Sequence, residues 1–144
     1  MSESKEYCTF HVEGMFFGVE VQLVQEVIRY QEMTSVPLSS REISGLINLR
    51  GQIVTAIDVR RRLALADRPE GKLPMNVVVR TEDGAVSLLV DEIGDVLDVD
   101  TATYEPPPAT LDGVVRDLTT GIHKLKDRLL LLLDTAKTVN CVAA

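Results

Sequence analysis

The sequence predicts an all-β protein built from two small β-barrels that arise from an internal repeat, with short helices between strands. The expected strands are short, they end at Gly- or Pro-containing turns, and their pattern in the first half recurs in the second. A unit of about 70 residues buries a small share of its surface, so we expect the two barrels to dock and share a core.

The first half opens with a β-hairpin. Residues Tyr7–Val12 alternate between two faces, which is typical of a half-buried strand. Glu13-Gly14 forms the turn, because glycine adopts positive φ at little cost. The sequence MFFGVEV, which follows, returns as the second strand of the hairpin.

The first half ends with a strand and a helix. The segment QLVQEVIRY runs on to a stop at Val36-Pro37, and Ile53–Ile57 has the pattern of a strand. Asp58 stands at the N-cap position of a helix with the sequence VRRRLAL. Arg68–Pro74 contains Pro and Gly and indicates a linker.

The second half repeats these landmarks in the same order. Asn76–Thr81 predicts a strand, and Val86–Leu97 matches the pattern of Phe17–Ile28 at an offset of 69 positions. Gly121 lies 76 positions after Gly45. With the Asp83-Gly84 turn, 70 positions after Glu13-Gly14, these are four landmarks in one order. They favour a true repeat over the alternative, chance similarity between Val- and Leu-rich strands.

The repeat divides the chain, taken as one domain over residues 1–144, into two approximate subdomains. They are residues 6–68 and 74–142, and the sequence leaves open whether the two subdomains exchange strands. The run Leu129–Leu133 is too short to cross a membrane and predicts a strand buried on both faces.

The composition disfavours several classes of function and indicates the cellular compartment. The net charge of −7 disfavours binding to nucleic acid, which is itself negative, and aromatic platforms for single strands are scarce. Cys8 and Cys141 stand near opposite ends without metal-like spacing; a bridge between them is left open, and a reducing compartment is expected. The polar N-terminus lacks a signal peptide, so we expect a cytoplasmic protein.

No common catalytic or cofactor-binding motif occurs in the chain, so neither an enzyme nor a cofactor is expected. We expect His11 on a strand surface and His123 in a partly exposed turn. Asp58 and Asp134 are better explained as helix caps than as a catalytic pair. The cluster Arg60–Arg62 fits the solvent side of a short helix.

One turn distinguishes the two copies. The first copy reads NLRG, whereas the second reads KLKD, so that Lys126 and Asp127 replace Arg50 and Gly51. Either Gly51 only meets a need for positive φ, or Arg50 is a displayed donor that recognises a partner. In the second case we expect Glu26 and Arg50 at the rim of a groove with an apolar floor, formed by Val24, Ile28, Leu46 and Leu49.

The segments FGVEVQLVQEVI and ISGLINLRGQIVTAIDVRRRL closely resemble the CheW family of bacterial chemotaxis coupling proteins, and the resemblance spans about residues 6 to 140. It implies two SH3-like five-stranded β-barrels, no catalysis and no cofactor. It also implies an adaptor that couples the cytoplasmic hairpin tips of methyl-accepting chemoreceptors to the regulatory domain of the histidine kinase CheA. Such a protein is cytoplasmic and is recruited to membrane-associated receptor arrays.

The resemblance also implies where the receptor binds, whereas it places no kinase contact. The family often has proline where Thr55 stands, which bears on strand pairing more than on binding. The expected site lies near the groove between the barrels and consists of Val24, Glu26, Ile28, Gly45, Leu49, Arg50 and Gly51.

Overall fold

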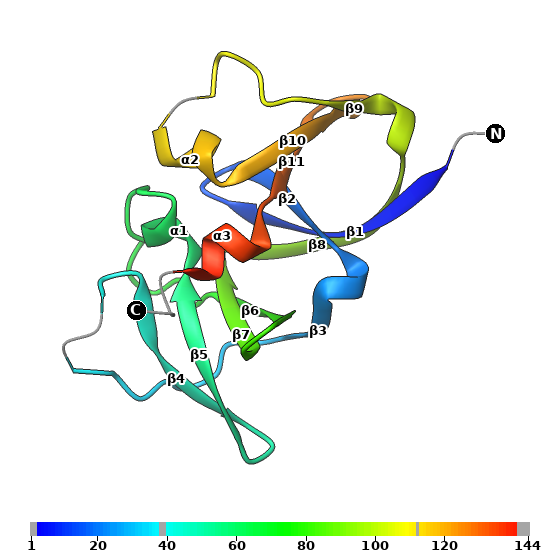
Figure 1. Ribbon diagram of the computed structural model, residues 1–144. Coiled ribbons are helices and arrows are strands. Elements are labelled where there is room, and N and C mark those ends of the chain that lie inside the picture. The colour runs from blue at the N-terminus through cyan, green and yellow to red at the C-terminus, as the bar shows by residue number, and fades with distance from the viewer. Residues whose placement is uncertain (1–2, 38–39, 112, 141–144) are drawn as a thin grey trace.

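The computed structural model describes residues 3–37, 40–111 and 113–140, and within them the regular secondary structure is mainly β-strand (Figure 1). The strands are β1 (Ser4–Val12), β2 (Met15–Glu20), β3 (Val24–Ile28), β4 (Ile43–Leu49), β5 (Gln52–Asp58), β6 (Met75–Thr81), β7 (Gly84–Val90), β8 (Glu92–Asp100), β9 (Tyr104–Glu105), β10 (Thr119–Lys124) and β11 (Leu129–Leu133). The helices are η1 (Val21–Leu23) and η2 (Thr101–Thr103), both 3-10, and α1 (Val59–Arg62), α2 (Gly113–Asp117) and α3 (Thr135–Val139).

The strands form two sheets, and each sheet draws on both halves of the sequence. Sheet A has the order β8-β1-β2-β11-β10-β9, and sheet B has the order β3-β6-β7-β5-β4. The hairpin β1–β2 is therefore inserted between strands of the second half, and β6–β7 is inserted between strands of the first half. Neither sheet consists of residues 6–68 or 74–142 alone, because the two halves exchange their hairpins.

The pairing registers of the two sheets are equivalent. In sheet B, Thr55 of β5 pairs with Val86 of β7 in parallel, and in sheet A, Leu131 of β11 pairs with Phe17 of β2. These pairs are related by the offsets of 76 and 69 positions found in the sequence. The register shift between Val24 and Glu26 in sheet B recurs opposite Cys8–Phe10 in sheet A. Chance similarity does not explain matched registers, so the repeat is a structural one.

Both sheets close into barrels. In sheet A, β9 continues β8 after the single turn η2 and pairs with β10, so the two edges of the sheet meet. In sheet B, the segment after β3 reaches β4 through a pair of backbone hydrogen bonds, each 2.8 Å long, between Thr34 and Leu46. We call the closed sheets barrel A and barrel B. The expected all-β fold with two barrel subdomains is confirmed; sheet B has the expected five strands, whereas sheet A has six, because β8 and its continuation β9 form separate strands.

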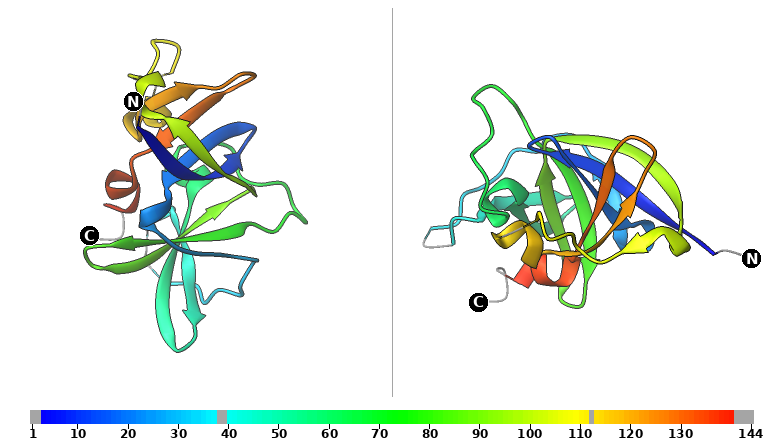
Figure 2. Two further views of the ribbon diagram at one scale, coloured as in Figure 1. Left: turned by 90° about the vertical axis from the view of Figure 1, so that its right-hand side faces the viewer. Right: turned by 90° about the horizontal axis from the view of Figure 1, so that it is seen from above.

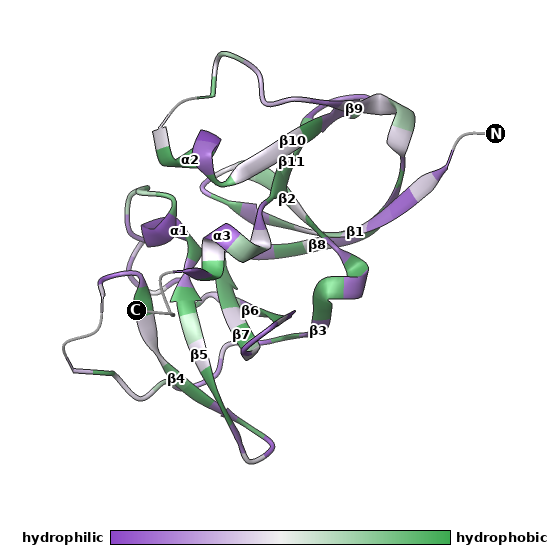
Figure 3. Cartoon of the chain, in the orientation of Figure 1, coloured by the Kyte–Doolittle hydropathy of each residue, from purple (hydrophilic) through white to green (hydrophobic). Residues whose placement is uncertain are grey.

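The two barrels lie against each other (Figure 2), their strands contain many hydrophobic residues (Figure 3), and they share an apolar core. Smaller clusters fill the inside of each barrel, around Ile47 and Leu89 in barrel B and around Tyr7 and Leu130 in barrel A. The shared core takes side chains from both sheets: Phe10, Val12, Phe17, Val19, Ile57, Val59, Leu63, Val77, Val79, Val86, Leu88, Val90, Leu118, Ile122, Leu131 and Leu133.

The predicted helix caps are confirmed. The Asp58 carboxylate accepts a hydrogen bond from the backbone N–H of Arg60 at 3.0 Å, and the Asp134 carboxylate accepts one from that of Lys137 at 3.0 Å. The prediction of a partly exposed turn at His123 is wrong: this residue lies in β10 and is buried. Cys8 is half-buried in β1, and Cys141 lies outside the described residues.

The arginines of α1 bind other parts of the protein, which corrects the expectation that they form a solvent face. Arg62 donates hydrogen bonds to the carbonyls of Lys137 and Thr138, at 2.7 and 2.9 Å, and so connects α1 to α3. The Arg60 side chain is only 11% exposed and contacts Asp91 at 2.6 Å. A triplet of basic residues thus has two members that hold the barrels together.

Asp91 is the centre of a network of charged groups where the chain crosses from barrel B to barrel A. It lies between β7 and β8 and accepts hydrogen bonds from Arg60, from Arg68 at 3.0 Å and from the backbone N–H of Glu13 at 2.7 Å. Arg68 also contacts Asp58 at 3.6 Å. Burial opposes ionisation of Asp91, but the hydrogen bonds from Arg60, Glu13 and Arg68 outweigh it, so its pKa lies below the ordinary value.

Replacing Asp91 by asparagine is expected to destabilise the protein by about 3 kcal/mol, because the change leaves Arg60 and Arg68 partly buried without their shared counter-charge. The free energy of unfolding in urea measures the effect. Asp67 offers a matched control, since it pairs with Arg41 and Arg61 at an exposed position. Asp67→Asn should cost much less stability than Asp91→Asn, because solvent screens an exposed ion pair. Equal losses in the two variants would contradict the structural role of Asp91.

Asp91 should also contribute to acid sensitivity. A carboxyl whose pKa is depressed by folding stabilises the native state above its unfolded pKa of about 3.9. That contribution is lost as the pH falls through the lower native pKa. The stability difference between wild type and Asp91→Asn, measured in urea from pH 7 down to pH 2, should therefore shrink at the acid end. A constant difference over this range would show that the Asp91 charge is not responsible.

Candidate functional site

The turn that distinguishes the two copies connects β4 and β5 at the free end of barrel B, away from barrel A (Figure 2, left). Arg50 and Gly51 form a two-residue hairpin turn with φ values of 51° and 87°. Two positive φ values are typical of a type I′ turn, which matches the twist of paired strands. The backbone N–H of Gly51 donates to the Asn48 side chain at 2.8 Å, which fixes the turn.

Glycine occupies only one of the two turn positions that have positive φ. A residue with a Cβ is disfavoured in the left-handed region by about 1 kcal/mol, and Arg50 occupies it. The fold therefore does not favour arginine at this position on backbone grounds. Its guanidinium reaches back across the barrel and pairs with the carboxylate of Glu26.

The Glu26–Arg50 pair joins opposite edges of sheet B. Glu26 lies on β3, at the register shift after Val24, whereas Arg50 belongs to the β4–β5 hairpin. Closure of the barrel brings these edges together. The Arg50 side chain remains 75% exposed, whereas that of Glu26 is 18% exposed. The guanidinium of Arg50 is therefore accessible to a partner while the largely buried Glu26 carboxylate holds it in place. An exposed pair of this kind stabilises the fold weakly, by about 1 kcal/mol at most.

Of the other residues of the expected site, Gly45 and Leu49 are buried, and Val24 and Ile28 are half-buried. Leu49 and Ile28 pack in the interior of barrel B, and Val24 packs against the shared core. Gly45 is buried at the β-bulge in β4, where a Cβ would lie 2.7 Å from the Thr34 carbonyl oxygen. This glycine allows the segment after β3 to close the barrel.

The expected apolar groove floor is therefore not a single surface. Leu49 and Ile28 point into barrel B and Val24 toward the shared core, while Leu46 lines a separate hollow of about 490 Å³. Ile53, at 61% exposure, is the most exposed apolar side chain around that hollow. The structure thus brings Glu26, Arg50 and Gly51 together and leaves the apolar members of the set in supporting positions.

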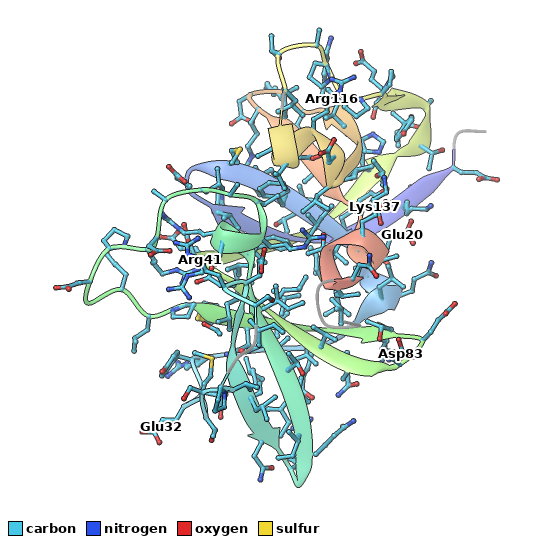
Figure 4. The ribbon with its side chains drawn as sticks, turned by 60° about the vertical axis from the view of Figure 1, so that its left-hand side comes forward. Glu20, Glu32, Arg41, Asp83, Arg116 and Lys137 are labelled. Atoms are coloured by element: carbon cyan, nitrogen blue, oxygen red, sulfur yellow. The ribbon has the colours of Figure 1, made fainter. Side chains whose placement is uncertain are left out.

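A groove between the barrels does exist, at another place. It has a volume of about 640 Å³ and contains none of the seven expected residues. Its walls come from α3 and the β6–β7 turn, with Lys137 and Asp83 marking these elements in Figure 4. Leu23 reaches it, and Arg80 holds that region by donating to the carbonyls of Gln22 and Val24 at 3.1 Å. Sequence reasoning missed this groove, because its lining comes from distant segments without a shared motif.

The second copy uses its hairpin differently. Residues 125–128 connect β10 to β11, and no residue of this connection has positive φ. The Arg128 guanidinium stacks 3.7 Å from the centre of the Phe16 ring, which is a cation–π contact with its own barrel. The exposed cation held on a left-handed turn is therefore a feature of the first copy alone, within the part of the chain that is described.

The described residues contain no group of three or more His, Cys, Asp or Glu side chains arranged to hold a metal ion. Within the same residues, no helix has the length and apolar character needed to cross a membrane.

Comparison with known proteins identifies the fold with a family. A family model described as "CheW-like domain" matches residues 6–142. The chemotaxis protein CheW of Bacillus subtilis is 31% identical over 128 residues, which cover 87% of this chain and 80% of that protein. The chemotaxis protein CheW of Klebsiella aerogenes is 27% identical over 136 residues, covering 94% and 82%.

A solved structure gives the same result. The scaffolding protein TtCheW from Thermoanaerobacter tengcongensis superposes with a TM-score of 0.80 at 28% sequence identity, covering 92% of this chain and 89% of that one. The match of sequence and fold over nearly the whole chain shows that this protein belongs to the CheW-like domain family.

Proposed function

We propose that the protein is a non-enzymatic adaptor of bacterial chemotaxis, which couples the cytoplasmic hairpin tips of methyl-accepting chemoreceptors to the regulatory domain of the histidine kinase CheA. The observation that carries this proposal is the family match over residues 6–142, together with relatives named as chemotaxis and scaffolding proteins. The adaptor would work in the cytoplasm and would be recruited to membrane-associated receptor arrays.

The receptor-binding surface in this proposal is centred on Glu26, Arg50 and Gly51. Arg50 is exposed, yet its backbone is held by a tight turn and its guanidinium by Glu26, so little conformational entropy is lost when a partner binds. Gly51 lacks a side chain and allows close approach of the partner backbone. The guanidinium still has free donors for bidentate recognition of a carboxylate or a carbonyl pair.

The buried and half-buried members of the proposed site act by holding Glu26 and Arg50 in position. Gly45 permits barrel closure, Leu49 anchors the β4–β5 hairpin, and Val24 and Ile28 hold β3 on either side of Glu26. Their substitution would displace the two charged groups without removing a contact to the receptor. This explains how residues with little exposed surface belong to a binding site.

Coupling requires that two partners bind to separate surfaces of one rigid body. The exchanged hairpins and the shared core join the barrels firmly, so an event at the free end of barrel B can be linked to a second surface elsewhere. A difference of 1–3 kcal/mol in how two receptor states bind would be sufficient to shift the kinase about 5- to 150-fold.

Arg50→Glu is expected to weaken receptor binding by about tenfold or more, equivalent to about 1.4 kcal/mol, because the new carboxylate faces Glu26 and removes the displayed donor. Pull-down and titration with a receptor hairpin tip measure the loss, and binding to a CheA regulatory domain should be retained. Lys126→Glu is the matched control, since Lys126 occupies the equivalent turn of the second copy and is also exposed. If wild type binds neither bait, the proposed partners are wrong.

Exchanging the charges of Glu26 and Arg50 distinguishes a role of Arg50 in receptor binding from a role in protein stability. In the double variant Glu26→Arg/Arg50→Glu the ion pair can re-form with reversed polarity, so the stability lost in either single variant should largely return. Receptor binding should not return if Arg50 itself contacts the receptor. Recovery of both stability and binding would mean that Arg50 only fastens the hairpin to β3, and the receptor contact would then have to lie elsewhere.

A further inference from the structure

His123 is a buried histidine at a position where the repeat elsewhere has an apolar residue. It corresponds to Ile47 of the first copy at the offset of 76 positions, and it is 2% exposed. Its ring lies 5.9 Å from the rings of both Tyr7 and Tyr104. A histidine in such a place changes the properties of barrel A, because its charge depends on pH near neutrality.

The hydrogen bonds define the neutral form of the ring. The Nδ1 atom of His123 lies 2.8 Å from the hydroxyl oxygen of Thr103, whose hydrogen is donated to the Asp100 carbonyl at 2.9 Å. A hydroxyl has a single hydrogen, so Nδ1 carries a proton and donates to Thr103. A second proton would have to enter at Nε2 and place a full charge inside the barrel.

The same residue lies where the two edges of sheet A meet and close barrel A. Strand β9 closes the barrel through only two pairs with β10, Glu105 with Ile122 and Tyr104 with His123 (Figure 1). The Tyr104 ring packs directly on Gly121, and its hydroxyl donates to the Thr120 carbonyl at 2.8 Å. The closing segment 101–105 is therefore held by groups that surround His123.

We propose that His123 is a pH-sensitive latch of barrel A: the neutral ring holds residues 101–105 against β10, and protonation of the ring releases this segment. The released segment would open the seam between β9 and β10, while the pairing of β10 with β11 is retained. The latch is a property of this chain's second copy and does not depend on the adaptor role proposed above.

The charged groups around His123 decide the direction of the effect. Burial lowers its pKa, a hydrogen bond to the Thr103 backbone and the negative charge of Asp100 partly oppose this, and Lys5 of β1 adds to the lowering. Burial raises the pKa of Tyr7, so this neighbour contributes no charge, and the facing residue of β11 is the apolar Leu130. A histidine with a lowered pKa stabilises the closed form above its ordinary pKa of about 6.5 and loses that contribution as the pH falls through the lower value.

Hydrogen exchange tests the latch in the intact protein. Between pH 8 and pH 5, the protection factors of the amides in 104–105 and 122–123, corrected for intrinsic exchange, should fall about tenfold for each unit by which closure lowers the pKa. His123→Ile, which restores the residue of the first copy, should remove the pH dependence. His11→Gln, a change in the chain's other histidine, should keep it.

An NMR titration of the His123 ring in the wild type reports the latch without any substitution. Its ring should titrate below about 6.5, and the acid form should coincide with the loss of protection at Tyr104. A His123 ring that titrates at or above this value overturns the proposal. Protection that is unchanged by pH, or that changes equally in wild type and His123→Ile, overturns it as well.

Discussion

The exchange of hairpins between the two halves of the chain is the constraint on which the rest of the structure depends. Each barrel is completed by a hairpin from the other half, in parallel pairing with matched register. Neither half can satisfy the backbone hydrogen bonds of its own edge strands, because the strands that would cover them belong to the other sheet. The two barrels therefore form one cooperative unit with a shared core, as the proposed adaptor role requires.

The exchange also explains where charge is buried. At the crossover from β7 to β8 the chain passes between barrels, and its polar backbone and the turn of the β1–β2 hairpin come together there. Asp91 accepts hydrogen bonds from Arg60, Arg68 and Glu13 at this point, and Arg62 joins α1 to α3 nearby. Buried charges are tolerated when each has a counter-charge and satisfied hydrogen bonds, and here they fix the position of one barrel on the other.

Duplication allowed the two copies to diverge in chemistry while the pairing stayed the same. The first copy displays Arg50 on a left-handed turn against Glu26, whereas the second folds Arg128 onto Phe16. Conversely, the interior position filled by Ile47 in the first copy is taken by His123 in the second. Equivalent backbone positions thus have a displayed cation in one barrel and a titratable core residue in the other.

The sequence by itself determined the strands, the caps at Asp58 and Asp134, the repeat and the asymmetry of the NLRG turn, because these depend on local periodicity and turn chemistry. Tertiary structure decided which half supplies each strand, the burial of His123, the network around Asp91 and the inward positions of Leu49 and Ile28. Alternation of apolar and polar residues indicates that one face of a strand is buried, but it does not identify the strand that pairs with it. Contacts between segments tens of residues apart form only when the sheets close. Local periodicity and turn residues do not specify which distant strands come together, so these contacts could not be predicted from the sequence.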